Sequence, residues 1–175
     1  VLCAARELRE IAKTLGMSGE AVTTIIARGR EKLLAERDGR ETPFVDRTLY
    51  TSLNGMFITS FLKAYRVLGD AGLRDFALKS LDRVLKERFI DGALYHTEGV
   101  PAVLDDHVYI IEALVAAYEA TGDLAWLDAA TAFMDRCLER FGDGEGGFFD
   151  TGEEVLGARL KRVEDIPHPS ANATA

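Results

Sequence analysis

The spacing of apolar residues along the chain predicts helices arranged in hairpins. Over residues 53–68 apolar side chains occupy most of the circumference of one predicted helix, which is typical of a helix packed on several sides. The next predicted helix, residues 73–85, keeps its apolar side chains on one face and its charged side chains on the other. We therefore expect an inner helix and an outer helix, joined at Gly69-Asp70.

The same pattern recurs 53 residues further along the chain. Ala117-Tyr118 and Gly122-Asp123 repeat Ala64-Tyr65 and Gly69-Asp70. The outer helices also match: Leu73 with Trp126, Ala77 with Ala130, Arg83 with Arg136, and Leu85 with Leu138. Because each repeated hairpin buries its inner face only against its neighbours, the sequence predicts an all-α fold, either a curved solenoid or an α/α toroid.

A short segment rich in glycine and aromatic residues follows each outer helix, at residues 89–96 and 141–150. Glycine permits tight turns there, and we expect the aromatic side chains to pack across the helix ends. Residues 142–147 have the glycine content of a phosphate cradle or a calcium loop. They lack the Lys-Ser/Thr ending of the first and the oxygen-ligand spacing of the second, so a turn is expected.

Residues 1–40 predict an N-terminal helical hairpin. Apolar residues from Leu2 to Leu15 follow helical spacing, Gly16 is suited to end that helix, and Ser18 is suited to cap the next one. The repeated hairpins occupy residues 41–175, and both parts are expected to form a single structural domain. The second N-terminal helix carries one apolar stripe that should pack on one side: Val22, Ile25, Ile26, Gly29 and Leu33.

The N-terminal hairpin also resembles the helix-turn-helix of sigma-factor-like regulators over residues 9–18 and the stripe that follows. Residues 1–40 carry eight Lys or Arg against six Asp or Glu, and the whole chain has a formal net charge of -8. Because nucleic-acid phosphates are contacted by clustered Lys and Arg, we expect no nucleic-acid partner. DNA binding through residues 9–34 is a distant alternative.

Composition favours one soluble, well-buried domain, since 47% of the 175 residues are hydrophobic and 29% are charged. No apolar run approaches the ~20 residues that cross a bilayer, and no signal-peptide pattern begins the chain, so a cytoplasmic location is expected. Cys3 and Cys137 are interpreted as reduced, mostly buried thiols. Because His96 and His168 show no metal-ligand spacing, neither a metal nor another cofactor is expected.

The strongest candidate for chemistry is Asp105-Asp106-His107, at the start of a predicted apolar helix. Asp106, His107 and Glu112 are the predicted catalytic residues, because acid/base catalysis uses groups that titrate near neutrality. Glu112 is a little more than one turn beyond His107 and lies near its face. These side chains are expected to point into the cavity of a toroid.

Structural roles for the same side chains stay open. Either aspartate can cap the helix by accepting hydrogen bonds from its free backbone amides. His107 occupies the position equivalent to Asn54 in the repeat, and a polar side chain on an apolar helix can be held by one neighbouring carbonyl. Glu112 either acts with His107 or merely forms a hydrogen bond with it.

Several motifs are spread over nearly the whole chain. They are Leu104-Asp105-Asp106-His107, residues 118–123, Trp126-Leu127, residues 146–152 and residues 169–172. Together they resemble the C-terminal part of the YyaL/spermatogenesis-associated protein 20 family of thioredoxin-domain-containing proteins. The resemblance implies a six-hairpin α/α toroid related to N-acylglucosamine 2-epimerases and glycoside-processing enzymes. This chain then holds a partial toroid, without the thioredoxin-like domain that lies upstream in the family.

Residues 44–55 correspond to a family stretch that reads roughly Asp-Asp-Lys-x-x-Thr-Ser-Trp-Asn-Gly. Five positions match it: Asp46, Thr51, Ser52, Asn54 and Gly55. Three positions replace an acid, a lysine and a tryptophan of the family: Arg47, Thr48 and Leu53. The departures imply either a different ligand or an active site that has been lost.

From these features we expect a carbohydrate-related protein that binds a sugar, or is epimerase- or isomerase-like in its full-length form. Such proton transfer needs no cofactor. The predicted substrate-binding residues are polar groups near the catalytic ones and two aromatic platforms: Asp46, Asn54, Asp105, Tyr50 and Tyr109. The alternative is a non-catalytic helical interaction scaffold.

The chain begins at Val1 without a methionine and encodes only part of a toroid wall, so it is interpreted as a piece of a longer protein. Alone it is expected to be inactive, because catalytic geometry tolerates little displacement. A tail from Val155 onward should lead into another hairpin. Missing chain or a second copy of the protein is expected to cover the exposed inner helices.

Overall fold

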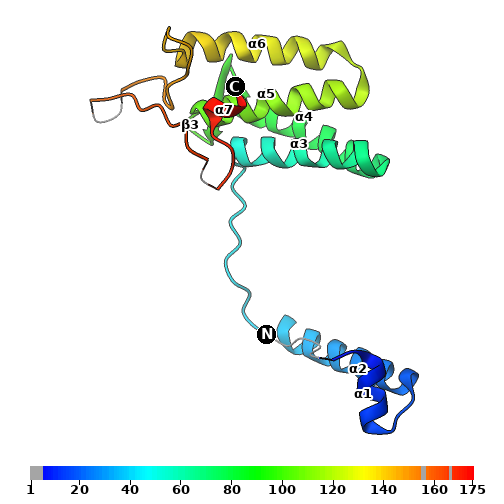
Figure 1. Ribbon diagram of the computed structural model, residues 1–175. Coiled ribbons are helices and arrows are strands. Elements are labelled where there is room, and N and C mark those ends of the chain that lie inside the picture. The colour runs from blue at the N-terminus through cyan, green and yellow to red at the C-terminus, as the bar shows by residue number, and fades with distance from the viewer. Residues whose placement is uncertain (1–5, 155–156, 166) are drawn as a thin grey trace. The chain divides into compact units, whose positions relative to one another are not determined.

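The computed structural model describes residues 6–154, 157–165 and 167–175 (Figure 1). Leu2, Cys3 and Val155 lie outside the described residues. The predicted helix start, the predicted buried thiol and the predicted start of the tail at these positions therefore stay predictions. The chain divides into two compact units, Val1–Asp46 and Arg47–Ala175. Each unit is described by itself, and their association into a single structural domain stays a prediction.

The first unit is a helical hairpin of α1 (Leu8–Leu15) and α2 (Gly19–Asp38). Gly16 ends α1 in the left-handed conformation, with a φ of 65°, which glycine adopts without a steric penalty. The Ser18 hydroxyl caps α2 by accepting a hydrogen bond from the Ala21 amide at 3.2 Å. The predicted helix stop and helix cap are therefore both confirmed.

Within this unit the apolar stripe of α2 is fully buried only near the start of the helix. Val22 is buried, whereas Ile25 and Leu33 leave 55% and 56% of their surfaces exposed. Within this unit α1 leaves much of the stripe uncovered, because its eight residues cannot cover a helix of 20 residues. The expectation that the stripe packs along one side stays a prediction.

The second unit contains two hairpins of equal size. They are α3 (Thr51–Leu68) with α4 (Ala71–Arg88), and α5 (Leu104–Thr121) with α6 (Leu124–Phe141). All four helices have 18 residues, and the second hairpin begins 53 residues after the first. Helices α3 and α5 pack against each other, while α4 covers α3 and α6 covers α5 (Figure 1). This arrangement confirms the predicted inner and outer helices.

The two hairpin turns are built in the same way. Gly69 and Gly122 end the inner helices with φ values of 71° and 72°. The carboxylates of Asp70 and Asp123 then cap the outer helices, each by accepting a hydrogen bond from the backbone amide two residues further on. The repeated Gly-Asp pair in the sequence thus has a direct structural cause.

Helix α5 lies at the centre of the unit and is buried along most of its length. Its core side chains include Val108, Ile110 and Leu114, all 2% exposed or less. At Gly55 the backbones of α3 and α5 approach closely, because a Cβ atom there would lie 2.7 Å from the carbonyl oxygen of Tyr109. No side chain fits between the two inner helices at this point.

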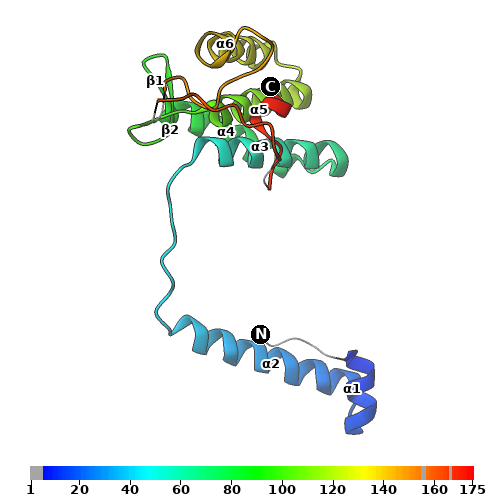
Figure 2. The same cartoon turned by 60° about the vertical axis from the view of Figure 1, so that its left-hand side comes forward.

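The segment after α4 is a small antiparallel sheet, in the order β1 (Phe89–Ile90), β2 (Ala93–Thr97), β3 (Val100–Pro101) (Figure 2). Turns had been expected here. β1 and β3, with two residues each, are too short to show the alternation of apolar and polar residues by which a strand is predicted, and the five residues of β2 do not alternate. In the second return segment, the Asp143 carboxylate accepts hydrogen bonds from the amides of Glu145 and Gly147, and the expected turn is confirmed.

A short helix, α7 (Ala171–Thr174), packs against α5 near the C-terminus. The hydroxyl of Ser170 caps it by accepting a hydrogen bond from the Ala173 amide at 3.1 Å. The hairpins of this unit do not close into a barrel. Within the described parts of the chain, no helix is both long and apolar enough to cross a membrane.

Candidate functional site

A pocket of about 420 Å³ lies at the beginning of α5. Val103 and Asp105 form one wall, and the irregular chain after α6 forms the others. The polar side chains that line it are Asp105, Asp150, Thr151, Arg162, Glu164, His168 and Ser170. This volume lies within the range of small-molecule binding sites.

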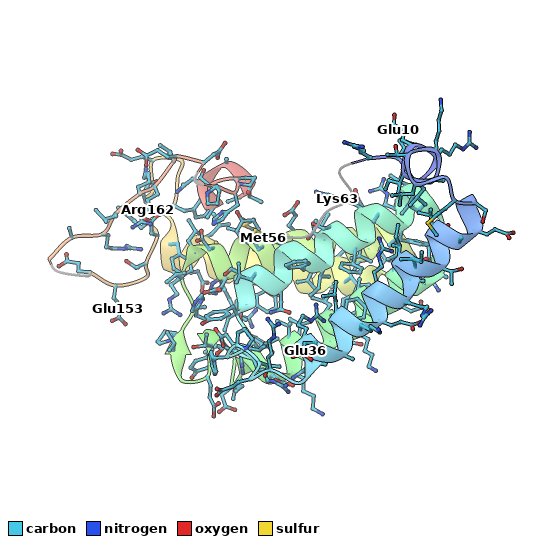
Figure 3. The ribbon with its side chains drawn as sticks, turned by 90° about the horizontal axis from the view of Figure 1, so that it is seen from below. Glu10, Glu36, Met56, Lys63, Glu153 and Arg162 are labelled. Atoms are coloured by element: carbon cyan, nitrogen blue, oxygen red, sulfur yellow. The ribbon has the colours of Figure 1, made fainter. Side chains whose placement is uncertain are left out.

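Backbone hydrogen bonds hold the irregular chain over the start of α5. The Leu104 amide donates to the Asp150 carbonyl at 2.9 Å, and the Asp150 amide donates to the Leu160 carbonyl at 2.8 Å. The Asp150 carboxylate also accepts a hydrogen bond from the Arg162 amide at 3.0 Å. Figure 3 shows Arg162 on this returning chain. The pocket is therefore walled by segments that are tied to α5.

Asp105 is the half-buried carboxyl of this pocket. Burial raises its pKa, because an ionised carboxylate loses solvation there. His168 and Arg162 oppose this rise, while Asp106 and Asp150 add to it. Asp105 thus holds its proton more strongly than an exposed aspartate, which is a property of carboxyls that act as acids.

His168 reaches the pocket beside Tyr109. The Tyr109 hydroxyl donates to the Pro169 carbonyl, and its oxygen lies 2.9 Å from Nδ1 of His168. Nδ1 of His168 also lies 3.0 Å from the Pro169 carbonyl oxygen. Burial raises the pKa of Tyr109. Tyr109 is 2% exposed, so its face is not an aromatic platform.

Asp106 points away from the pocket and is completely buried. Its carboxylate accepts hydrogen bonds from the Ser52 amide at 2.9 Å, the Val103 amide at 3.0 Å and Nδ1 of His96 at 2.9 Å. These donors come from α3, the start of α5 and β2. The geometry corresponds to the helix-capping role that the sequence left open for this residue.

His107 and Asn54 make equivalent hydrogen bonds in the two repeats. Nδ1 of His107 lies 3.2 Å from the Val103 carbonyl oxygen, and Nδ2 of Asn54 lies 2.7 Å from the Tyr50 carbonyl oxygen. Burial lowers the pKa of His107, which favours the neutral ring. A single neighbouring carbonyl thus holds each side chain.

The other predicted site residues lie elsewhere. Glu112 forms an ion pair with Lys63 of α3 at 2.9 Å, and Figure 3 labels Lys63 on that helix. Tyr50 packs against His96, with ring centres 5.5 Å apart. Asp46 belongs to the first unit. Asp106, His107 and Glu112 do not line the pocket at α5, and Asp105 is the predicted site residue that does. The catalytic role of the three stays a prediction.

Four charged or titratable residues of this pocket were not predicted from sequence: Asp150, Arg162, Glu164 and His168. Two of them had a detectable signal, because Asp150 lies inside one of the recognised motifs and His168 directly precedes another. Arg162 and Glu164 had none. Among the residues that the structure describes, no three His, Cys, Asp or Glu side chains are grouped so as to hold a metal ion.

Comparison with known proteins identifies relatives but no matching protein-family model. Human spermatogenesis-associated protein 20 is 30% identical over 195 residues, covering 100% of this chain and 25% of that protein. The rat protein of the same name is 28% identical, covering 91% of this chain and 23% of the relative. The chain thus spans about a quarter of the length of the curated relatives it matches.

Among solved structures, the chain resembles the GH76 α-mannanase of Bacteroides thetaiotaomicron. The TM-score is 0.55 at 18% sequence identity, covering 71% of this chain and 36% of the mannanase. At this identity the likeness concerns the fold. It confirms the predicted α/α-toroid architecture, here as a part that does not close.

Proposed function

Because the chain belongs to the family of spermatogenesis-associated protein 20, we propose that it forms part of a carbohydrate-binding α/α toroid whose sugar site is the pocket at α5. The α-mannanase with a similar fold supports the choice of ligand class. The observation that carries the proposal is the half-buried Asp105 carboxyl in a pocket that it shares with His168.

The pocket suits a sugar because hydroxyl groups both donate and accept hydrogen bonds. Asp105 and Glu164 offer carboxyl oxygens, Arg162 offers N–H donors, and the His168 imidazole offers a ring nitrogen. Its volume of about 420 Å³ accommodates a single sugar unit. Leu160 and Ala171 add apolar surface against which the carbon face of a sugar can pack.

Asp105 is the proposed proton donor and acceptor in an epimerase- or isomerase-like reaction. One group removes a proton beside the carbonyl of the open-chain sugar, and an acid returns it. The raised pKa of Asp105 suits the protonated form to this second step. Asp106, which the sequence favoured for catalysis, supports the site from behind by fixing the first turn of α5.

Ligand-observed NMR with a panel of hexoses and N-acetylhexosamines tests the binding proposal. We expect saturation transfer from the protein to at least one sugar, and about a tenfold loss of affinity in Asp105→Asn. The matched control is Asp128→Asn, at an exposed position of α6, which should leave binding unchanged. Absence of binding to every sugar, or equal binding by Asp105→Asn, contradicts the proposal.

Exchange of sugar protons in deuterated water tests the proton-transfer step separately. Deuterium should enter the carbon beside the carbonyl of a sugar that binds, and Asp105→Asn should abolish this exchange. Binding without exchange rules out the isomerase assignment and leaves a sugar-binding protein. Exchange that persists in Asp105→Asn removes Asp105 from the reaction.

A further inference from the structure

A second pocket, of about 450 Å³, lies between the β1–β2 turn, the first turns of α5 and the end of α6. Its lining residues are Gly92, Ala93, Leu94, His107, Arg136, Glu139 and Arg140. None of these residues lines the pocket assigned to a sugar. The second pocket is therefore a separate site, and the proposed function makes no use of it.

The internal repeat shows what is unusual about this pocket. In the first hairpin, Arg83 forms an ion pair with Glu87, four residues later on α4, at 2.8 Å. The equivalent positions of α6 are occupied by Arg136 and Arg140. A stabilising pair of opposite charges is thus replaced by two like charges on neighbouring turns, which repel each other.

Neither arginine has an acidic partner among the described residues, although Glu139 lines the same pocket. The Cζ atom of Arg136 lies 5.3 Å from the ring centre of Phe89, and that of Arg140 lies 5.6 Å from the ring centre of Phe141. Nη1 of Arg136 also donates a hydrogen bond to the Ala132 carbonyl at 2.9 Å. A guanidinium carries five N–H groups, so both side chains keep donors beyond these contacts. The pocket therefore has two positioned cations for an anionic ligand.

His107 adds a hydrogen-bond acceptor to these two cations. Its Nδ1 donates to the Val103 carbonyl, which fixes the tautomer and makes Nε2 the acceptor of the neutral ring. The ring is held edge-on against Phe141, with ring centres 5.0 Å apart. Burial lowers the pKa of His107, and the charges of Arg140 and Arg136 lower it further. Because Nε2 accepts hydrogen bonds, an anion that carries its own proton suits this pocket.

We propose that this pocket binds the phosphate group of a phosphorylated small molecule in its monohydrogen form. The anionic oxygens accept hydrogen bonds from Arg136 and Arg140, and the P–OH group donates to Nε2 of His107. Glu139, on the same wall, disfavours a fully ionised phosphate. Sulfate carries no proton near neutral pH and fits the site less well.

NMR of the imidazole protons tests this assignment with inorganic phosphate as the probe. Slightly below neutral pH, phosphate should shift the His107 signals in a saturable way, and sulfate at equal ionic strength should bind more weakly. The double variant Arg136→Gln/Arg140→Gln should lose about tenfold or more in phosphate affinity. Arg83→Gln, at the position equivalent to Arg136, is the matched control and should bind like the parent.

A second variant separates loss of binding from loss of fold. Arg140→Glu recreates on α6 the spacing of the Arg83–Glu87 ion pair, so it should keep the thermal stability of the parent and lose phosphate binding. Equal shifts with sulfate, or shifts that persist in the double variant, overturn the phosphate site.

The source of the phosphate is tested by comparing a hexose monophosphate, the unphosphorylated hexose and inorganic phosphate on the His107 signals. The hexose monophosphate should bind more tightly than inorganic phosphate, and the hexose should leave these signals unchanged. A hexose monophosphate that binds no better than inorganic phosphate overturns the assignment to a phosphorylated small molecule.

Discussion

At the scale of single residues, Asp105 and Asp106 show how far sequence predicts a site. Both carboxylates were recognised, but consecutive residues of a helix point in directions about 100° apart, so they could not share a role. Asp106 is the third helical residue of α5, from which a carboxylate returns to the amide before the helix. Asp105 is left facing the pocket. The partner His168 is 63 residues away, and no local pattern predicts their approach.

Replacing Asp106 should destabilise the fold strongly. Asp106→Ala leaves the buried amide of Ser52 and the amide of Val103 without an acceptor, which should cost about 3 kcal/mol in the free energy of unfolding. Asp105→Ala, one residue away, should change stability by less than about 1 kcal/mol. Urea denaturation measures both. Similar values for the two variants would show that Asp106 does not tie α3 to α5.

The raised pKa of Asp105 predicts a pH-dependent stability. Because the folded state binds this proton more strongly, the contribution of Asp105 is fully present below the ordinary pKa of 3.8 and is lost as pH rises through the higher folded value. Asp105→Asn keeps the hydrogen-bonding shape without ionising. Its melting temperature should exceed that of the parent at neutral pH, and the gain should vanish in acid. A gain that is independent of pH would contradict the raised pKa.

At the scale of elements, the repeat predicted the helices well and the connections poorly. The Gly-Asp turns and the inner and outer helices follow from apolar spacing that is repeated after 53 residues. The strands β1 to β3 are short and irregular, and their pairing depends on the neighbouring helices more than on their own residues. The described residues that wall the pocket after α6 likewise have no periodic pattern, and the Leu104 amide of α5 holds the Asp150 carbonyl by a hydrogen bond.

The close approach of α3 and α5 predicts the effect of one added methyl group. Gly55→Ala places a Cβ atom against the backbone of Tyr109, which cannot move aside easily, and should cost about 2 kcal/mol or more. Gly29→Ala in α2 is the control, because nothing lies within 4 Å of the new atom and alanine favours helix. Thermal unfolding should show destabilisation for Gly55→Ala alone. A neutral Gly55→Ala would mean that the inner helices are packed less closely.

At the scale of the whole molecule, the two hairpins and the short helix of the second unit make an open part of a toroid. Leu53 and Phe57, on the inner helix α3, leave 48% and 67% of their surfaces exposed. From the sequence we expect missing chain or a second copy of the protein to cover this surface. Length and apolar spacing predict such a face, but they do not identify what covers it.

Light scattering after size-exclusion chromatography tests that expectation. The isolated chain should show a mass above that of a monomer, and the mass should fall toward the monomer in Phe57→Ser. Leu124→Ser, at a residue of α6 that is 61% exposed, should leave the mass unchanged. A parent chain that stays monomeric at high concentration contradicts the need for a covering partner.

The most direct test of the central claim is to map where a sugar binds by following backbone amide signals during titration. The account predicts saturable shifts at Asp105, Thr151 and Ser170, around the pocket at α5. The amides of Gly92 and Glu139, which line the other pocket, should stay unchanged. Two results would contradict the assignment of this pocket to carbohydrate binding. One is that a sugar shifts amide signals elsewhere but not at the start of α5, and the other is that none of the sugars tested shifts any amide signal.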